Sequence, residues 1–294
     1  EFIGCRLPYN SSFLTSIINF GGIEVLLPLI DQVDMPNRSN EENQQFLISL
    51  LKLFLLLNNS CDMIELHFTQ SKGDKSLAHT FSKLSPYLLT NDVFNALINL
   101  YFSLRYGKSR TDMILDFLLN YNSWSKLTAN QFNDLNSICI LPTIIHEFES
   151  EINIPNYKNV YRHSVPFSYL LSIIVEINNE EIRFCYLQIF MSLIKYTFEK
   201  SNQEYFINLT FKLTGNMQKQ FLLILDEIVE KDYGEFHHQL TNPLFYSNLV
   251  SLASQDEITR KTVIKIFING RKYITKEPIQ FDVAILRFIR SLNV

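Results

Sequence analysis

Residues 91–102 read NDVFNALINLYF, and this stretch decides the fold. Asn91 stands ahead of the apolar residues and is a candidate N-cap. Apolar side chains then recur at the i, i+3, i+4, i+7 and i+8 positions, which lie on one face of a helix. They are Phe94, Leu97, Ile98, Tyr101 and Phe102. The stretch therefore predicts an amphipathic α-helix.

The same periodicity recurs from one end of the chain to the other, with short polar or glycine-containing breaks between the stripes. No strict repeat of 33 or 34 residues is present, which disfavours ankyrin and tetratricopeptide arrays. Irregular helix pairs of about 40 residues are typical of armadillo and HEAT repeats, in which stacked neighbours bury each other's apolar faces. We therefore predict an all-α fold, an armadillo/HEAT-like α-solenoid of irregular helix pairs. Further stripes lie at 111–119, 182–198, 221–229, 263–268 and 285–289.

The longest irregular stretch, 149–166, contains two prolines and is a candidate subdomain break. Otherwise the chain, 1–294, is expected to be a single armadillo-like segment. It begins without Met and ends within a helical pattern at Val294, so we expect it to be part of a larger protein.

Composition favours a soluble, cytoplasmic protein. Apolar residues make up 47% of the chain, yet no run of about 18 uncharged apolar residues exists that would predict a transmembrane helix. The most apolar stretch, 46–57, contains Lys52 and is interpreted as a buried helix. The net charge of −4 gives no drive toward nucleic acid. Four cysteines lie far apart without a CxxC pair and are interpreted as reduced core thiols, namely Cys5, Cys61, Cys139 and Cys185.

The sequence contains no pattern of a known catalytic site, and we predict that the chain is not an enzyme and binds no cofactor or metal. Phosphate-binding loops, HExxH and GxSxG are all missing. Gly21 and Gly22 precede a helix start, where an anion site is one alternative and a tight helix–helix turn the preferred one. Asp232 and Glu235 with His237 or His238 form the one carboxylate–histidine combination considered as a cryptic site, against the preferred interpretation of a solvated helix end.

Two further features bear on partners. Trp124, the single tryptophan, lies between two predicted helices and is interpreted as a wedge in the core, with a partner hot spot as the alternative.

The chain from Thr259 to Val294 has eight basic residues against two acidic ones, so it could face acidic lipid headgroups or an acidic partner. A solvated face, or contact with a downstream domain, is the alternative. The candidate patch is Arg260, Lys261, Lys265, Arg271, Lys272 and Lys276.

Three stretches together resemble the helical region of BEACH-domain proteins, the beige and neurobeachin class. They are Ile17–Ile30 (IINFGGIEVLLPLI), Leu84–Leu97 (LSPYLLTNDVFNAL) and Tyr121–Lys126 (YNSWSK). The resemblance covers residues 15 to 135, and the second half has no matching stretch. It implies a place in a very large cytosolic trafficking protein that has a PH-like module, a BEACH domain and WD40 repeats further along. It implies no catalytic residue.

The leading hypothesis is therefore a non-catalytic scaffold segment acting in vesicle trafficking and membrane dynamics. It would bind protein partners and neighbouring domains, make weak contact with anionic membranes, and bind no nucleic acid. The alternatives are a HEAT or armadillo adaptor of another pathway, such as nuclear transport, and an all-helical enzyme with a cryptic site.

Overall fold

The computed structural model describes residues 15–151, 167–273 and 290. These residues form helices and turns without any strand, which confirms the predicted all-α class. They divide into two compact units, 1–165 with 172–189 and 166–171 with 190–294. Most of the candidate break, 149–166, lies outside the described residues, so that boundary stays a prediction.

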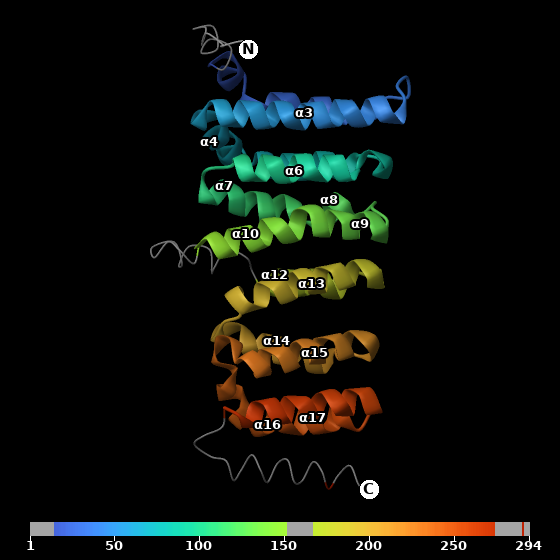
Figure 1. Ribbon diagram of the computed structural model, residues 1–294, viewed down its shortest axis with the longest axis vertical. Coiled ribbons are helices and arrows are strands. Elements are labelled where there is room, and N and C mark those ends of the chain that lie inside the picture. The colour runs from blue at the N-terminus through green and yellow to red at the C-terminus, as the bar shows by residue number, and fades with distance from the viewer. Residues whose placement is uncertain (1–14, 152–166, 274–289, 291–294) are drawn as a thin grey trace, which may run out of the picture. The chain divides into compact units, whose positions relative to one another are not determined.

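Unit 1 is built from helices of unequal length joined by tight turns (Figure 1). The division between the units falls within α12 and α13. The elements up to that point are η1 (Gly22–Leu26), α2 (Leu27–Asp31), α3 (Asn40–Ser60), α4 (Asp62–Gln70), α5 (Gly73–Lys83), η2 (Pro86–Leu88), α6 (Asn91–Ser103), α7 (Gly107–Asp112), η3 (Met113–Leu118), α8 (Tyr121–Trp124), α9 (Ala129–Leu135), η4 (Asn136–Ile140), α10 (Leu141–Glu151), α12 (Phe167–Glu176) and α13 (Glu180–Thr197).

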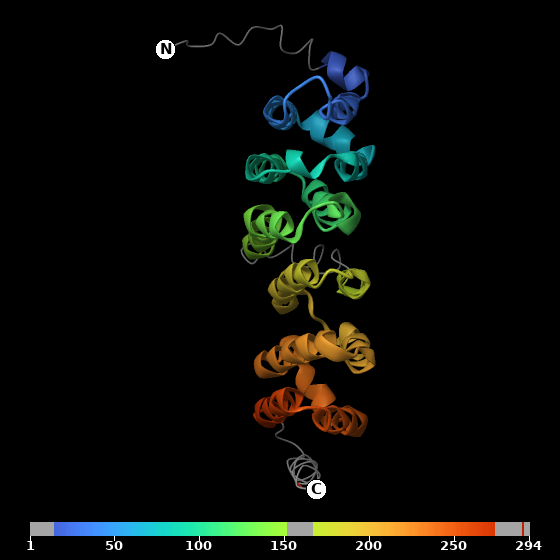
Figure 2. The same cartoon turned by 90° about the vertical axis from the view of Figure 1, so that its right-hand side faces the viewer.

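The helices of unit 1 lie in two layers, seen end-on in the blue to green part of Figure 2. In one layer α3 packs on α6, and α6 packs on α9 and η4. In the other layer α2 packs on α5, and α5 packs on η3 and α8. Each helix pair thus covers the apolar face of the next, which is the arrangement of an α-solenoid.

Hydrogen bonds between successive pairs show the repeat length. The Asn58 carboxamide donates to the Ser103 carbonyl, 45 residues on, at 3.0 Å. The Thr69 and Ser109 hydroxyls, 40 residues apart, lie 2.6 Å from each other. In unit 2, Asn269 donates to Asp226, 43 residues earlier, at 3.0 Å. These offsets confirm irregular pairs of about 40 residues.

Unit 2 has a core of stacked phenylalanines. Phe206 is fully buried and its ring centroid lies 6.1 Å from that of Phe190 and 5.6 Å from that of Phe221. Aromatic pairs at this separation add to the free energy gained from burial alone. The elements that follow α13 are α14 (Lys200–Lys212), α15 (Gly215–Lys231), η5 (Tyr233–Thr241), α16 (Pro243–Ala253) and α17 (Glu257–Arg271).

The predicted role of Trp124 as a core wedge is confirmed. The indole is fully buried and donates its Nε1–H to the Leu118 carbonyl at 3.0 Å. Its ring centroid lies 5.0 Å from that of Phe117 and 5.8 Å from that of Phe81. Because no part of the side chain reaches the surface, the alternative of a partner hot spot is wrong.

The glycine pair forms the predicted tight turn. Gly21 has φ 115° and Gly22 has φ 69°, which L side chains rarely adopt. A Cβ on Gly22 would lie 2.8 Å from Nδ1 of His67, so the backbone approaches α4 as closely as a glycine allows. The element that follows, η1, is a 3₁₀ helix of five residues, which is too short for an anion site to be argued.

The cysteine prediction is confirmed for two residues and wrong for a third. Cys139 and Cys185 are buried free thiols, and burial raises the pKa of the Cys139 thiol to about 12. Cys61 is also free but only half-buried, because it occupies the turn between α3 and α4 rather than a helix face. Cys5 lies outside the described residues.

No single helix in the described part of the chain is long and apolar enough to cross a membrane. The pair α3 and α4 passes that test only when taken together, and the two helices are bent by 113°.

Candidate interaction surface

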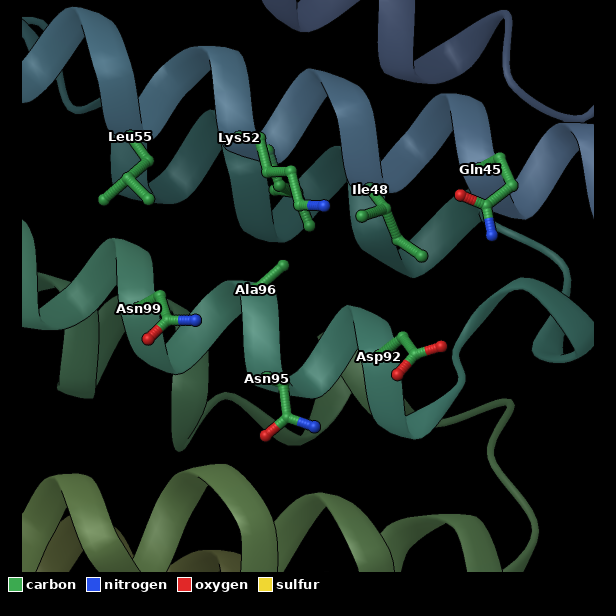
Figure 3. Close-up of a pocket in the computed structure, with 9 residues that line it drawn as sticks. Gln45, Ile48, Lys52, Leu55, Asp92, Asn95, Ala96 and Asn99 are labelled. Atoms are coloured by element: carbon green, nitrogen blue, oxygen red, sulfur yellow. The ribbon is translucent and has the colours of Figure 1, made fainter. Parts of the chain in front are cut away.

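A groove runs between the parallel helices α3 and α6 on the surface of unit 1 (Figure 3). It encloses a hollow of about 430 Å³. Buried apolar residues form its floor, and the small side chain of Ala96 leaves the space open above α6. The floor residues are Ile48, Leu51 and Ala96, with Leu55 at one end, and the rim residues are Gln45, Lys52, Asp92, Asn95 and Asn99.

Local sequence fixes both helices that form the groove. Ser39 and Glu42 make a capping box at the start of α3, with the Glu42 N–H donating to the Ser39 hydroxyl at 3.2 Å. The chain reaches α6 through η2, which starts with Pro86, and α6 begins after Thr90 rather than at the predicted N-cap Asn91. Cap positions commonly shift by one residue in this way.

Polar contacts hold both ends of the groove. Near its start, the Gln44 carboxamide donates to the Tyr87 carbonyl at 2.8 Å and the Asn43 carboxamide donates to the Tyr87 hydroxyl at 3.4 Å. At its far end, Asn58 donates to the Ser103 carbonyl at 3.0 Å. The spacing of α3 and α6 is therefore fixed before any partner arrives, which lowers the entropic cost of binding.

The rim residues are exposed and free. Across the described ranges, no hydrogen bond or ion pair involves the side chain of any rim residue. Figure 3 shows Lys52 reaching from α3 into the space above Ala96, whereas Asn95 points from α6 away from α3. The lining thus combines an apolar floor with three carboxamides, one ammonium and one carboxylate. That combination is typical of a binding surface, since few polar groups set orientation and apolar contact supplies affinity.

Sequence reasoning missed this groove, although its signals were in the sequence. Lys52 interrupts the most apolar stretch of the chain, and it is exposed on α3 where a fully buried helix was expected. Asn95 and Asn99 stand four residues apart within the helix that decides the fold. Polar residues at that spacing share one helix face, but the sequence alone does not show which helix lies beside them.

The predicted basic patch lies on α17 and just beyond it, and the structure shows local partners for several of its members. The Lys261 ammonium pairs with Glu257 at 2.7 Å, and the Arg260 guanidinium donates to the Ala253 carbonyl at 3.3 Å. Lys272 donates to the Asn269 side chain at 3.3 Å. Lys265 and Arg271 are exposed on the same helix, and Lys276 lies outside the described residues.

The carboxylate–histidine combination is brought together, but as part of a turn. Asp232 ends α15 with φ 52° and accepts the backbone N–H of His237 at 2.7 Å. Its other oxygen lies 2.8 Å from Nδ1 of His237, and His238 approaches Glu235 at 3.6 Å. The two Asp232 contacts tie η5 to the end of α15, whereas the His238–Glu235 contact lies within η5. In the part of the chain that the structure describes, no group of three or more His, Cys, Asp or Glu side chains could hold a metal ion.

The described residues thus form an α-solenoid with a surface groove between two of its helices. Residues 4–138 match the family model described as the neurobeachin/BDCP DUF4704 alpha solenoid region. This range contains the three stretches that resemble BEACH-domain proteins and the whole α3–α6 groove, so this part of the chain is similar to that family region. No curated protein matches the chain.

Proposed function

We propose that this chain is a non-catalytic scaffold segment of a BEACH-type protein that holds protein partners in vesicle trafficking and membrane dynamics at the cytoplasmic side. The observation that supports it best is the α3–α6 groove, where five rim side chains are free above a buried apolar floor. Hydrogen bonds hold both ends of the groove, so the surface can bind a partner without rearranging.

The alternatives have less support. An adaptor of another pathway, such as nuclear transport, would share the solenoid but not the match to the neurobeachin/BDCP region. The enzyme alternative rested on Asp232 and His237, whose contact closes the turn between α15 and η5. A structural role accounts for both residues.

A photo-cross-linking amino acid at Asn99 in the full-length parent protein tests the scaffold role. We expect cross-links to a defined protein of vesicle membranes, lost when Lys52→Glu is introduced in the same chain. The matched control places the cross-linker at Glu41, which is exposed on α3 outside the groove. The same cross-linked partners from both positions, or none at Asn99 in cells that contain the full protein, would contradict a partner-binding groove.

We also propose that α17 makes weak contact with anionic membranes. Exposed basic and apolar side chains alternate on this helix, with Ile264 36% and Ile268 60% exposed beside Lys265. Such a face can rest on anionic lipid, with the cations contributing electrostatic attraction. The contact is expected to be weak because Lys261 and Arg260 already have partners within the chain.

Co-sedimentation with phosphatidylserine vesicles tests the α17 proposal. We expect binding at low ionic strength that disappears in physiological salt, since exposed charges are screened there. The double variant Lys265→Glu, Lys272→Glu should lose it, whereas Lys52→Glu on unit 1 should keep most of it. Absence of binding at low ionic strength would remove the proposal.

A further inference from the structure

We propose that Ser85 is a phosphorylation site for a proline-directed protein kinase, and that its phosphate releases residues 34–38, in the connection between α2 and α3. The inference goes beyond the proposed scaffold function and does not depend on it. It rests on the sequence and backbone at Ser85, on the carboxylate that the Ser85 hydroxyl contacts, and on the lysine that lies near both.

The sequence and the backbone at Ser85 suit a kinase of this class. Ser85 is the only serine or threonine of the chain that directly precedes a proline. Proline-directed kinases bind their substrate in an extended conformation and require a proline directly after the modified residue. The residue before a proline is biased toward that conformation. Ser85 adopts it, with φ −70° and ψ 139°, and its hydroxyl meets the exposed Asp34 at the surface.

The Ser85 hydroxyl ties the connection between α2 and α3 to the segment that leads into α6. It donates to the Asp34 carboxylate, which also accepts the hydroxyl of Tyr87. These two hydrogen bonds, with the one from Ser85 as the larger cause, hold the pKa of Asp34 below its ordinary value. The partner of Ser85 is therefore a charged carboxylate at neutral pH.

Transfer of the γ-phosphoryl group of ATP to Ser85 reverses this contact. The Oγ–H bond breaks, an Oγ–P bond forms, the bond from the γ-phosphorus to ADP breaks, and the kinase takes up the hydroxyl proton. The phosphoester has no hydrogen to donate, and it carries about −1.5 to −2 charges at pH 7. Two anions then face each other where the hydrogen bond was. Repulsion of this kind disrupts the contact between a phosphate and a neighbouring carboxylate.

A cation that can bind the phosphate lies close by. Lys126 is exposed, and its ammonium donates to the Lys83 carbonyl, two residues before Ser85, at 2.8 Å. After the two hydroxyl hydrogen bonds, the charge of Lys126 also lowers the pKa of Asp34, so the ammonium faces the same place. Contacts between an ammonium and a phosphate are strong because both groups are charged. The modified Ser85 thus exchanges a carboxylate partner for an ammonium.

The contacts around Asp34 limit how far the release extends. Val33 is fully buried directly before residues 34–38, and Ser39 caps α3 directly after them. The hydrogen bond from Gln44 to the Tyr87 carbonyl, at 2.8 Å, does not involve Asp34. The phosphate is therefore expected to free residues 34–38 without separating α3 from η2.

Phosphorylation of the full chain tests the site. The probe is MgATP with a mitogen-activated or cyclin-dependent protein kinase, and mass spectrometry locates the phosphate. We expect Ser85 to be modified at least tenfold faster than any other serine or threonine, and Pro86→Ala to remove this preference. Modification of Ser85 only in the urea-unfolded chain, or faster modification of another residue, would overturn the site.

Limited proteolysis with trypsin tests the release. Arg38 lies with its guanidinium 4.7 Å from the ring centroid of Phe46, so cleavage after Arg38 reports the opening of residues 34–38. We expect this cleavage to be at least tenfold faster in the phosphorylated chain, whereas cleavage after Lys212 at the end of α14 keeps its rate. In phosphorylated Asp34→Asn the acceleration should disappear, because no carboxylate is left to repel the phosphate.

Ser85→Ala separates the charge of the phosphate from the loss of the hydroxyl donor. It should accelerate cleavage after Arg38 by less than about threefold, and circular dichroism confirms that each variant is folded. Equal rates with and without phosphate, or the same acceleration in Asp34→Asn, would overturn the release. An acceleration in Ser85→Ala as large as that caused by the phosphate would overturn the role of repulsion.

Discussion

Glu65 is a charged side chain in the interior of unit 1, with 1% of its surface exposed. Its Oε1 accepts the backbone N–H groups of Arg105 and Tyr106 at 3.0 and 2.8 Å, and its Oε2 lies 2.9 Å from the Arg105 nitrogen. These N–H groups belong to the bend between α6 and α7, where no helix supplies their acceptors. The carboxylate therefore stabilises a chain reversal that brings two helices together.

Replacing this carboxylate tests its contribution. Glu65→Gln keeps the shape, but it leaves a single, uncharged acceptor oxygen and a buried NH₂ group that faces the Arg105 N–H. We expect the free energy of unfolding to fall by about 1–3 kcal/mol, the usual cost of unsatisfied buried donors. Urea denaturation followed by the fluorescence of Trp124, in the same unit, measures it. Glu41→Gln, on the exposed start of α3, should change it by less than ~0.5 kcal/mol, and equal losses would contradict the assignment.

Asp74 gives unit 1 a dependence on pH. Its side chain is 1% exposed, and burial, followed by the neighbouring Asp116 and Asp112 carboxyl groups, raises its pKa from 3.8 to about 7. Between those two values the folded protein keeps a proton that the unfolded chain has released. The contribution of Asp74 to stability is therefore greatest below about pH 4 and falls as the pH rises toward 7.

Replacing the Asp74 carboxyl group should remove the pH dependence of the free energy of unfolding. One proton changes the free energy of unfolding by at most about 1.4 kcal/mol per pH unit, so wild-type unit 1 should lose stability steadily between pH 4 and 7. Asp74→Asn should flatten this slope and be the more stable protein at pH 8. Urea denaturation at one-unit pH steps decides the matter. A parallel slope in wild type and variant would show that other groups cause it.

At the scale of helices, the sequence predicted which segments are helical but not how each is wound. The stripe at 111–119 was expected to consist of Ile114, Leu115, Leu118 and Leu119. Three of these are buried, but Leu115 is only half-buried, and the π-helix η3 buries Phe117 as well. A π turn holds one residue more than an α turn, so the buried face shifts. The groove was unpredictable for a related reason. Lys52 and Asn99 lie on different helices, and their proximity depends on the packing of α3 on α6.

The burial of Trp124 on α8 also depends on tertiary packing, and a substitution tests how much it contributes to stability. Trp124→Ala empties a site enclosed by Phe81 and Phe117, and it leaves the Leu118 carbonyl without its donor. We expect a loss of about 3–5 kcal/mol in the free energy of unfolding, the range for large aromatic truncations. Thermal denaturation followed by circular dichroism measures it. Phe184→Ala on α13, where the ring is 52% exposed, is the control and should cost far less.

Over the whole chain, two compact units have separate cores, and the position of the tryptophan makes them distinguishable. Trp124 lies in unit 1, whereas the stacked Phe190, Phe206 and Phe221 belong to unit 2. In a repeat protein, stability is a sum of repeat terms and nearest-neighbour interfaces, so damage at one place need not spread. Far-ultraviolet circular dichroism reports helices of both units, while tryptophan fluorescence reports unit 1 alone.

Phe206→Ala is therefore expected to separate the two unfolding transitions. The variant loses a fully buried ring from unit 2, at a cost of about 3–5 kcal/mol. The circular dichroism signal should fall in two steps, the first at lower urea than in the wild type. The midpoint of the Trp124 fluorescence should stay where it was, because the core of unit 1 is untouched. If the fluorescence midpoint moves with the first step, the chain unfolds as one cooperative body.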